Sequence, residues 1–337
     1  MSLAKLSNIF QPAIEKELKN AVDSINGTDY KELNQMIAYH MGWDELNNGK
    51  VTGGKRIRPL ITLLTTASAE GEWEKALPAA TAVELIHNFS LLHDDIEDKS
   101  LIRRGRPTVW SKWGLAQAIN TGDSILSLAN NIILNLKNTT SLQIASEANA
   151  IIQNTCLNLT KGQFLDIQFE GRQDITITDY RTMIGGKTAA LISAACELGA
   201  VIAETDKIIQ NHYRLFGLNL GLAYQVLDDI LGIWGDTNKI GKSNFSDLAT
   251  SKKSLPVLYG LELKGKFASM WKPIGNNLGE IQQLADQLEM EGGKTYSQEI
   301  ADQYTNEALI SLERANPQGD AGKALYQLSM KLLDRDI

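Results

Sequence analysis

Two long apolar stretches of the chain each end in a group of aspartates. The first runs from Leu77 to Asp98 and leaves almost no polar face when it is drawn as a helix; the second, Tyr213 to Ile233, is similar. Helices that are apolar on most sides are buried. Carboxylates at the ends of buried helices are unfavourable unless a cation compensates for their charge. The two stretches therefore predict a helical protein with a cation site.

Apolar residues recur at three- and four-residue steps along most of the chain, and its 337 residues include only seven prolines. Breaks are expected where Gly, Pro, Asn and Asp cluster, at 47–54, 99–108, Gly185-Gly186, 235–253 and 316–322. None of them reads as a linker between domains. We therefore expect an all-α fold, with residues 1–337 forming a single domain.

Composition excludes several classes of function. The 33 Lys and Arg residues against 40 Asp and Glu give a net charge of −7, which disfavours binding of nucleic acid over the whole surface. Cys156 and Cys196 have no CxxC or His-rich spacing, so we expect two core residues and no disulfide scaffold or structural zinc. The weakly charged run 189–203 contains Glu197 and is shorter than the roughly 20 residues of a membrane span. Without a signal-like start, we expect a cytoplasmic protein.

The first acidic group contains Asp94, Asp95, Glu97 and Asp98. Asp94 and Asp98 lie one helical turn apart, so their carboxylates can point the same way and share cations. Oxygen ligands without a His or Cys cluster fit Mg²⁺ rather than zinc. The alternative reading is a solvated acidic helix end.

The second acidic group is shorter. Asp228 and Asp229 end an apolar helix, but the position one turn after Asp228 is Gly232, and Asp236 lies two turns further along. Paired aspartates in a helix are weak support for a site on their own. Together with the first group they are stronger, because two buried helices can face each other across one cavity and hold several metal ions.

Basic groups accompany the acids. Residues 53–59 read Gly-Gly-Lys-Arg-Ile-Arg-Pro, and residues 103–107 read Arg-Arg-Gly-Arg-Pro; Lys187, Lys242, Lys252 and Lys253 follow later in the chain. Neutralisation of the surface is the alternative reading. A diphosphate needs Mg²⁺ on one side and Arg or Lys on the other, which fits the alternation of acids and bases. The GxxxxGK[ST] loop of the P-loop enzymes is absent.

These segments resemble the trans-isoprenyl diphosphate synthases, the polyprenyl synthetase family that includes farnesyl and geranylgeranyl diphosphate synthases. Residues 53–59 look like its GGKRxRP segment, and residues 94–98 with 103–108 look like its first DDxxD motif and the trailing RRGxPT. The later matches, in order, are Gly162-Gln163 with Asp166, Lys187-Thr188, Gln225 with Asp228-Asp229, Gly241-Lys242, Asp247, and Lys252 before Leu255-Pro256. The resemblance implies the isoprenoid synthase fold, a single large helical bundle around a central cavity. Gly232 departs from it, since the second motif usually has a third Asp there.

The resemblance also implies roles for individual residues. Three Mg²⁺ would hold the diphosphate of an allylic substrate, which is dimethylallyl, geranyl or farnesyl diphosphate. The metal ligands implied are Asp94, Asp95, Asp98 and Asp228, and the cations around the same diphosphate are Arg103, Lys187 and Lys252, with Lys242 and Gln225 also binding substrate. The groups implied to hold isopentenyl diphosphate are Lys55, Arg58, His87 and Arg104. Thr188, Gln225 and the carbonyl at the Gly185-Gly186 break would stabilise an allylic cation.

Product length follows from the wall of the cavity. Phe89 lies five residues before Asp94, with the small Ser90 beside it and Ile86 in the same helix. The resemblance implies that an aromatic residue here accompanies a C20 product, although Phe89 could instead be plain core. A C15 farnesyl diphosphate synthase, a class I terpene cyclase and a non-catalytic partner subunit stay open as alternatives, the last suggested only by Gly232. The resemblance also implies a homodimer.

Overall fold

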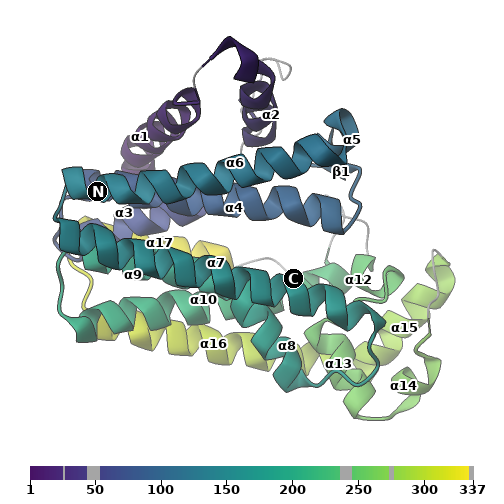
Figure 1. Ribbon diagram of the computed structural model, residues 1–337. Coiled ribbons are helices and arrows are strands. Elements are labelled where there is room, and N and C mark those ends of the chain that lie inside the picture. The colour runs from purple at the N-terminus through teal and green to yellow at the C-terminus, as the bar shows by residue number, and fades with distance from the viewer. Residues whose placement is uncertain (26, 44–53, 236–244, 273–276, 334–337) are drawn as a thin grey trace. The chain divides into compact units, whose positions relative to one another are not determined.

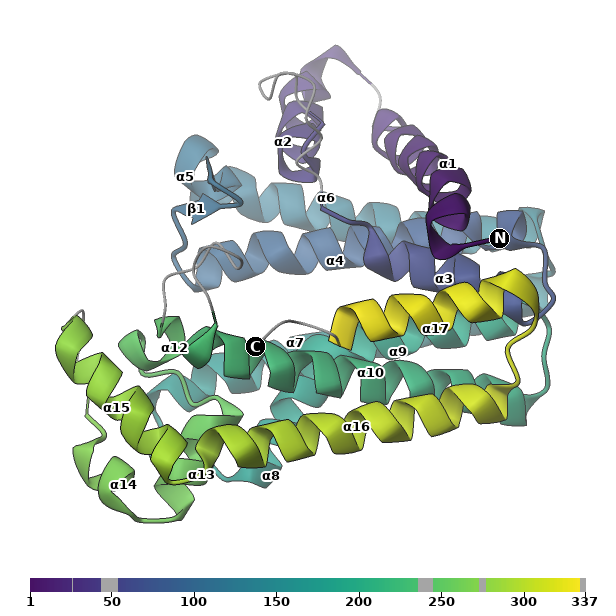
Figure 2. The same ribbon diagram turned by 180° about the vertical axis from the view of Figure 1, so that it is seen from behind.

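The computed structural model describes residues 1–25, 27–43, 54–235, 245–272 and 277–333, and these are almost entirely helical (Figures 1 and 2). This confirms the all-α prediction. The α-helices are α1 (Leu3–Asp23), α2 (Lys31–Met41), α3 (Ile57–Ser68), α4 (Leu77–Glu97), α5 (Val109–Trp113), α6 (Leu115–Leu134), α7 (Leu142–Gly171), α8 (Ile177–Ile184), α9 (Ala190–Ile202), α10 (Lys207–Trp234), α12 (Ser246–Ala249), α13 (Leu255–Glu262), α14 (Lys266–Met270), α15 (Leu278–Met290), α16 (Gly293–Ala315) and α17 (Gly319–Leu333). Short 3₁₀ turns are η1 (Thr28–Tyr30), η3 (Trp73–Ala76) and η4 (Asn135–Asn138), and η5 (Gly185–Ala189) is a π-helix. The strands β1 (Ile102–Arg103) and β2 (Arg106–Pro107) form one antiparallel pair.

The helices form two compact units. The first unit contains Met1–Asn154, Ala194–Gln210 and Pro317–Leu325, and the second contains Thr155–Ser193, Asn211–Asn316 and Tyr326–Ile337. Segments of the two units alternate along the chain, so neither unit is a contiguous piece of sequence. The single domain expected from the sequence stays a prediction.

In the first unit, α4 lies beside α6 (Figures 1 and 2). Helix α4 is buried on most of its sides, as its apolar sequence predicts, from Ala79 near its start to Asp95 near its end. Helix α6 buries one face, whose residues recur at three- and four-residue steps: Ala118, Gly122, Ile125, Ala129 and Ile133. The packing of this face against α4 holds the acidic end of α4 in place.

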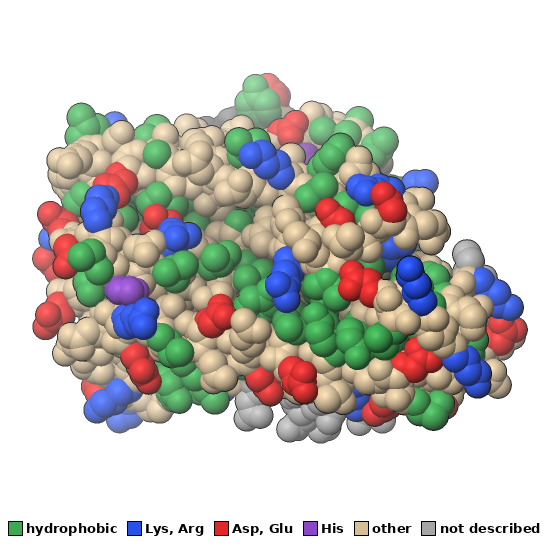
Figure 3. Space-filling model, turned by 90° about the horizontal axis from the view of Figure 1, so that it is seen from below, with side chains coloured by type: hydrophobic (Ala, Val, Ile, Leu, Met, Phe, Trp, Pro, Cys, Tyr) green, Lys and Arg blue, Asp and Glu red, His purple; other side chains and the backbone are tan. Residues whose placement is uncertain are grey.

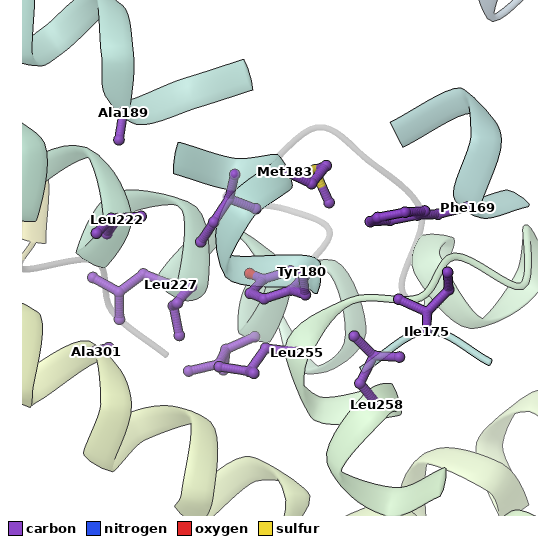
Figure 4. Close-up of a cluster of buried hydrophobic side chains, with 13 residues drawn as sticks. Phe169, Ile175, Tyr180, Met183, Ala189, Leu222, Leu227, Leu255, Leu258 and Ala301 are labelled. Carbon is purple, nitrogen blue, oxygen red and sulfur yellow. The ribbon is translucent and has the colours of Figure 1, made fainter. Parts of the chain in front are cut away.

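In the second unit, the C-terminal half of α10 packs in an apolar core with α8, α13 and α16. Figure 4 shows side chains from these helices pointing toward one another, among them Tyr180, Leu227, Leu255 and Ala301. Helix α8 starts at a capping box, in which the Thr176 backbone N–H donates to Asp179 and the Asp179 N–H donates to the Thr176 hydroxyl. This core fixes the segment of α10 that carries Asp228 and Asp229.

The expected breaks are only partly correct. Gly185 and Gly186 do not end a helix, because the chain continues from α8 through the π-turn η5 into α9. The break expected at 316–322 is shorter, since α17 begins at Gly319, and the one at 99–108 contains the β1–β2 hairpin. The break expected at 235–253 contains α12, while residues 236–244 lie outside the described ranges.

The surface carries charges of both signs, and the two cysteines differ in burial. Figure 3 shows basic and acidic side chains mixed over one face, with hydrophobic side chains gathered in a band. Cys196 is buried as expected, whereas Cys156 is only partly buried, and burial raises the pKa of the Cys156 thiol to about 11. One helical stretch, Ile177–Ile202, is long and apolar enough to cross a membrane, but 67% of its most apolar window is buried inside the protein, as in a core helix.

Candidate active site

The first unit brings the acidic end of α4 against Arg103. The Arg103 guanidinium donates from Nε to Asp95 Oδ1 at 2.7 Å and from Nη2 to Asp94 Oδ2 at 3.2 Å. Arg103 lies in β1, and the chain returns through β2 so that the Thr108 N–H donates to the Leu101 carbonyl. The hairpin therefore places a cation directly on the first acidic motif, as the short sequence separation predicts.

The three aspartates of this motif differ in exposure. The Asp95 side chain is 3% exposed, the Asp94 side chain is 21% exposed, and Asp98 is exposed at the end of α4. Burial raises the pKa of Asp95, and the Arg103 charge opposes that rise. The main contact of Asp95 is therefore with Arg103, while Asp94 and Asp98 can be reached by a ligand. Metal ligation by Asp95 stays a prediction.

A second basic group surrounds His87. Arg58 Nη1 lies 3.2 Å from His87 Nε2. The Arg104 guanidinium packs against Gly54, since a Cβ atom on Gly54 would lie 3.1 Å from Arg104 Nη2. Burial, together with the charges of Arg58 and Arg104, lowers the pKa of His87 well below its usual value. His87 is therefore a neutral imidazole that accepts from Arg58 at Nε2 and carries its proton on Nδ1. Lys55 is exposed just before α3.

Arg56 has a role that the sequence analysis did not assign. It adopts a left-handed backbone conformation with φ 45°, and its side chain is 3% exposed. Its guanidinium donates to Glu15 at 2.6 Å, to Glu84 at 2.8 Å and to the Met41 carbonyl at 3.1 Å. These bonds anchor the segment between Lys55 and Arg58. Glu84, a charge inside the apolar stretch 77–98, is the signal that could have revealed this pair.

In the second unit, α7 and the π-turn meet through two glycines. A Cβ atom on Gly162 would lie 2.1 Å from the Lys187 backbone N, and one on Gly186 would lie 2.6 Å from the Asn158 carbonyl oxygen. π-Turns inside helices are frequent at functional sites. This approach brings Lys187 Nζ to 2.5 Å from Asp166 Oδ2. The predicted Lys187 and the matched Asp166 therefore form one ion pair.

A chain of hydrogen bonds joins Thr188 to Asp229. The Thr188 hydroxyl donates to Gln225 Oε1 at 2.6 Å, and Gln225 Nε2 donates to Asp229 Oδ1 at 3.0 Å. The other Asp229 oxygen accepts from the Tyr180 hydroxyl at 2.6 Å and from the Leu255 N–H at 3.1 Å. Asp229 is buried, and both of its carboxylate oxygens accept hydrogen bonds that position Gln225, Tyr180 and the start of α13. The sequence analysis did not identify Tyr180.

Lys252 lies beside the second acidic motif, with Nζ 4.0 Å from Asp229 Oδ1. Burial opposes its charge, but Asp229 and then Asp247, Asp166 and Asp228 hold the pKa of Lys252 well above its usual value. Asp228 is partly exposed, unlike Asp229. Lys242 and Asp236 lie outside the described residues.

The donor chemistry of both motifs fits Mg²⁺. Across the part of the chain that the structure describes, no three His, Cys, Asp or Glu side chains are gathered closely enough to hold a metal ion by themselves. Mg²⁺ is usually bound by one or two carboxylates and completes its octahedron with water and substrate phosphate. The accessible Asp94, Asp98 and Asp228 offer such oxygen ligands. Each motif, taken by itself, therefore suits metal ions that arrive with a diphosphate.

The candidate chain-length residues lie upstream on α4. The rings of Phe89 and His93 are 4.6 Å apart between centroids, at an angle of 57°. His93 in turn packs on α6 where Gly122 has no side chain, since a Cβ atom there would lie 2.2 Å from His93 Nε2. Ile86 is buried, and the Ser90 hydroxyl donates to the His87 carbonyl at 2.8 Å. Phe89 is thus part of an aromatic pair, a contact that the sequence analysis did not foresee.

Known proteins resemble this chain over most of its length. The sequence model of the family described as Polyprenyl synthetase matches residues 44–290. A geranylgeranyl diphosphate synthase of Mycobacterium tuberculosis is 37% identical, covering 88% of this chain and 85% of its own length. A (2E,6E)-farnesyl diphosphate synthase of Mycobacterium bovis is 33% identical, covering 90% and 86%. The crystal structure of a geranylgeranyl pyrophosphate synthetase from Pyrococcus horikoshii superimposes with a TM-score of 0.88 at 28% identity, covering 99% of this chain and 98% of that one.

Proposed function

Because the chain belongs to the polyprenyl synthetase family, we propose that it joins isopentenyl diphosphate to an allylic diphosphate and that its main product is C20 geranylgeranyl diphosphate. It is a prenyltransferase of the short-chain trans type. A C15 farnesyl product is the second candidate, since relatives of both names match.

One observation carries the proposal: the first unit holds two groups of cations. Arg103 is bonded to Asp94 and Asp95, while Arg58 and Arg104 surround the neutral His87. Two such groups suit two diphosphate substrates. A terpene cyclase uses a single diphosphate and has no need of the group around His87.

The group around His87 would bind isopentenyl diphosphate. Arg58 and Arg104 donate to its oxygens, and the exposed Lys55 supplies a further charge. His87 would donate from Nδ1, because its Nε2 accepts from Arg58. The lowered pKa of His87 favours the neutral imidazole, which can accept at one ring nitrogen and donate from the other.

The acidic motifs would bind the allylic diphosphate. Asp94 and Asp98 in the first unit, and Asp228 in the second, would each offer oxygen ligands to Mg²⁺, proposed as three ions, whose charge stabilises the diphosphate as it leaves. Arg103, Lys187 and Lys252 would donate to the diphosphate oxygens, with Lys242 proposed alongside them. Each of these three described cations has a carboxylate beside it. Asp95 accepts from Arg103, Asp166 accepts from Lys187, and Asp229 lies 4.0 Å from Lys252.

The reaction breaks the allylic C–O bond and forms a C–C bond. The electron pair of the C–O bond leaves with diphosphate, and the double bond of isopentenyl diphosphate attacks the resulting cation. A proton is then lost from that substrate, and the released diphosphate accepts it. Gln225 is fixed at both ends by Thr188 and Asp229, so its dipole and that of the Thr188 hydroxyl would stabilise the cation without moving.

Product length would be set on α4. Phe89, supported by His93, would stop the growing chain, with Ile86 and Ser90 on the same helix. Phe89→Ala removes the ring and is expected to lengthen the main product beyond C20. Ile310→Ala, which removes an exposed apolar side chain of α16, is the control. An unchanged product of Phe89→Ala would remove it from this role.

The test of the function is product analysis. Purified protein with Mg²⁺ and isopentenyl diphosphate receives dimethylallyl, geranyl or farnesyl diphosphate in separate reactions, and products are identified by mass spectrometry. A dominant C20 product that is lost with a chelator supports the proposal, and a dominant C15 product supports the farnesyl alternative. Hydrocarbon formed without isopentenyl diphosphate would indicate a cyclase. An absence of turnover with every allylic substrate would contradict the proposal and favour a non-catalytic partner subunit.

A homodimer in the cytoplasm completes the proposal. Helix α6 exposes Leu115 and Ile119, which are 54% and 40% exposed and lie one turn apart. An exposed apolar row of this kind suits contact with a second copy. Light scattering is expected to give twice the chain mass of 37.1 kDa; a monomer at micromolar concentration would contradict it.

A further inference from the structure

Tyr180 lies in the apolar core of the second unit, but its hydroxyl faces a carboxylate. The residue is 2% exposed and belongs to the cluster that also contains Leu227, Leu255 and Leu258 (Figure 4). Its hydroxyl donates to Asp229 Oδ2 at 2.6 Å, and the same oxygen accepts from the Leu255 N–H at 3.1 Å. A phenylalanine ring would fill the same space in the core, so the hydroxyl needs an explanation of its own.

The Asp229 carboxylate decides which way the Gln225 amide is turned. An ionised carboxylate accepts hydrogen bonds and donates none, so Gln225 Nε2, at 3.0 Å from Asp229 Oδ1, is the donor. The amide oxygen Oε1 then faces the other way and accepts from the Thr188 hydroxyl at 2.6 Å. Because the Thr188 proton is used on Gln225, the Thr188 oxygen presents its lone pairs to other groups. Asp229 thus sets the sign of the dipoles that Gln225 and Thr188 present.

Tyr180 in turn restricts the Asp229 carboxylate. With Oδ2 held by Tyr180 and by the Leu255 N–H, Oδ1 is directed to Gln225. Burial, followed by the Asp229 charge, holds the pKa of Tyr180 well above its usual value, so the hydroxyl keeps its proton and donates. Without this bond the carboxylate can rotate about its Cβ–Cγ bond, and the Gln225 amide loses its fixed acceptor.

The two ends of this chain of hydrogen bonds come from one stretch of helix. Tyr180 lies in α8 and Thr188 in η5, which follows α8 directly, whereas Gln225 and Asp229 lie one turn apart on α10. The stretch α8–η5 is therefore joined to α10 at two points. All four residues belong to the second unit.

We propose that Tyr180 is a positioning residue for prenyl transfer, which acts through Asp229 to keep the oxygens of Gln225 and Thr188 turned toward the allylic cation. This inference rests on the proposed function, because it concerns the cation that forms when the allylic C–O bond breaks. An amide turned by 180° would present its N–H donors instead, and the positive end of a dipole destabilises a cation. Tyr180 therefore affects the rate of transfer and leaves the binding of both diphosphates unchanged.

Tyr180→Phe tests this role, because it removes the hydroxyl and keeps the ring in the core. The single-turnover rate constant for product formation is expected to fall about tenfold, the scale of one hydrogen bond to a charged group. The KM for each diphosphate should stay within about twofold of its original value. Rapid-quench and steady-state kinetics measure these constants. Tyr296→Phe, which removes the hydroxyl of a tyrosine packed against the same core, is the matched control with no expected change.

A double variant tests whether Tyr180 acts through Gln225. Gln225→Met has a side chain of similar size but no amide to orient. In that background Tyr180→Phe should lower the rate constant less than about twofold, because the group that Tyr180 positions is absent. A role of Tyr180 in packing alone would lower the rate constant equally in both backgrounds. Urea unfolding of each variant identifies those that are folded.

The outcomes distinguish the inference from the function on which it rests. If the unmodified protein transfers prenyl groups and folded Tyr180→Phe does so at the same rate, the inference is wrong and the function stands. The same holds if Tyr180→Phe slows transfer equally with and without the Gln225 amide. If the unmodified protein forms no prenyl product, both are wrong.

Discussion

Arg56 differs from the two cations that flank it, because the fold buries its side chain. Lys55 is exposed and Arg58 contacts His87, whereas Arg56 is paired with Glu15 and Glu84 inside the first unit. A guanidinium that is buried with satisfied donors fixes the backbone that carries it. Arg56 is therefore a positioning residue for its neighbours.

Arg56→Met is expected to destabilise the protein and to weaken isopentenyl diphosphate binding. Removing one partner leaves Glu84 buried and unpaired, which costs about 3 kcal/mol of unfolding free energy. The segment that carries Lys55 and Arg58 loses its anchor, so the KM for isopentenyl diphosphate should rise more than kcat falls. Urea unfolding and steady-state kinetics measure the two effects.

Combining Arg56→Met with Glu84→Gln is the control. The double variant has no unpaired buried charge, so part of the stability should return, while the raised KM should persist. An unfolding free energy of Arg56→Met equal to that of the unmodified protein would contradict the role of the buried pair.

At the scale of elements, the π-turn η5 connects α8 to α9 and places Lys187 and Thr188 one after the other. Its geometry depends on contact with α7, where Gly162 and Gly186 meet backbone to backbone. Gly185, the neighbour of Gly186, is helical with φ −57°, and a Cβ atom on it would meet no atom of the described residues within 4 Å. The contact with α7 therefore requires glycine at position 186 but not at position 185.

Alanine substitutions at Gly185 and Gly186 distinguish the roles of the two glycines. Gly186→Ala places a methyl group 2.6 Å from the Asn158 carbonyl oxygen and is expected to cost about 2 kcal/mol, the usual scale of overpacking. Gly185→Ala should be neutral or stabilising by up to about 1 kcal/mol, because alanine favours the helix. Urea unfolding measures both, and equal effects of the two substitutions would contradict this account of η5.

The sequence predicted what local patterns encode. The apolar stretches that became α4 and α10, and the motif residues Asp94 and Asp228, follow from periodicity and spacing. The continuation of the helix through Gly185 was missed, because it depends on a contact with α7 that has no local pattern. The hydrogen bond from Tyr180 to Asp229 was missed for the same reason, since the two residues are 49 positions apart and lie in different helices.

At the scale of the whole molecule, the two compact units share helices. Residues of α7, α9, α10 and α17 belong partly to one unit and partly to the other. A helix that continues through a unit boundary couples the stability of its two ends, because its hydrogen bonds form cooperatively. The single domain expected from the sequence stays a prediction, which unfolding can test.

Thermal unfolding is therefore expected to show one cooperative transition. Fluorescence and far-UV circular dichroism should report the same midpoint, and the calorimetric and van't Hoff enthalpies should agree once association is taken into account. Two separated transitions would show that the units are independent domains.

The central claim is that the group around His87 binds a diphosphate of its own, and Arg58→Gln tests it most directly. Removing a charged donor from this group should raise the KM for isopentenyl diphosphate at least tenfold, with the KM for the allylic substrate unchanged within about twofold. Steady-state kinetics in which each substrate is varied in turn measure both constants on the same preparation. A parallel rise in both constants, or product formed without isopentenyl diphosphate, would contradict the claim.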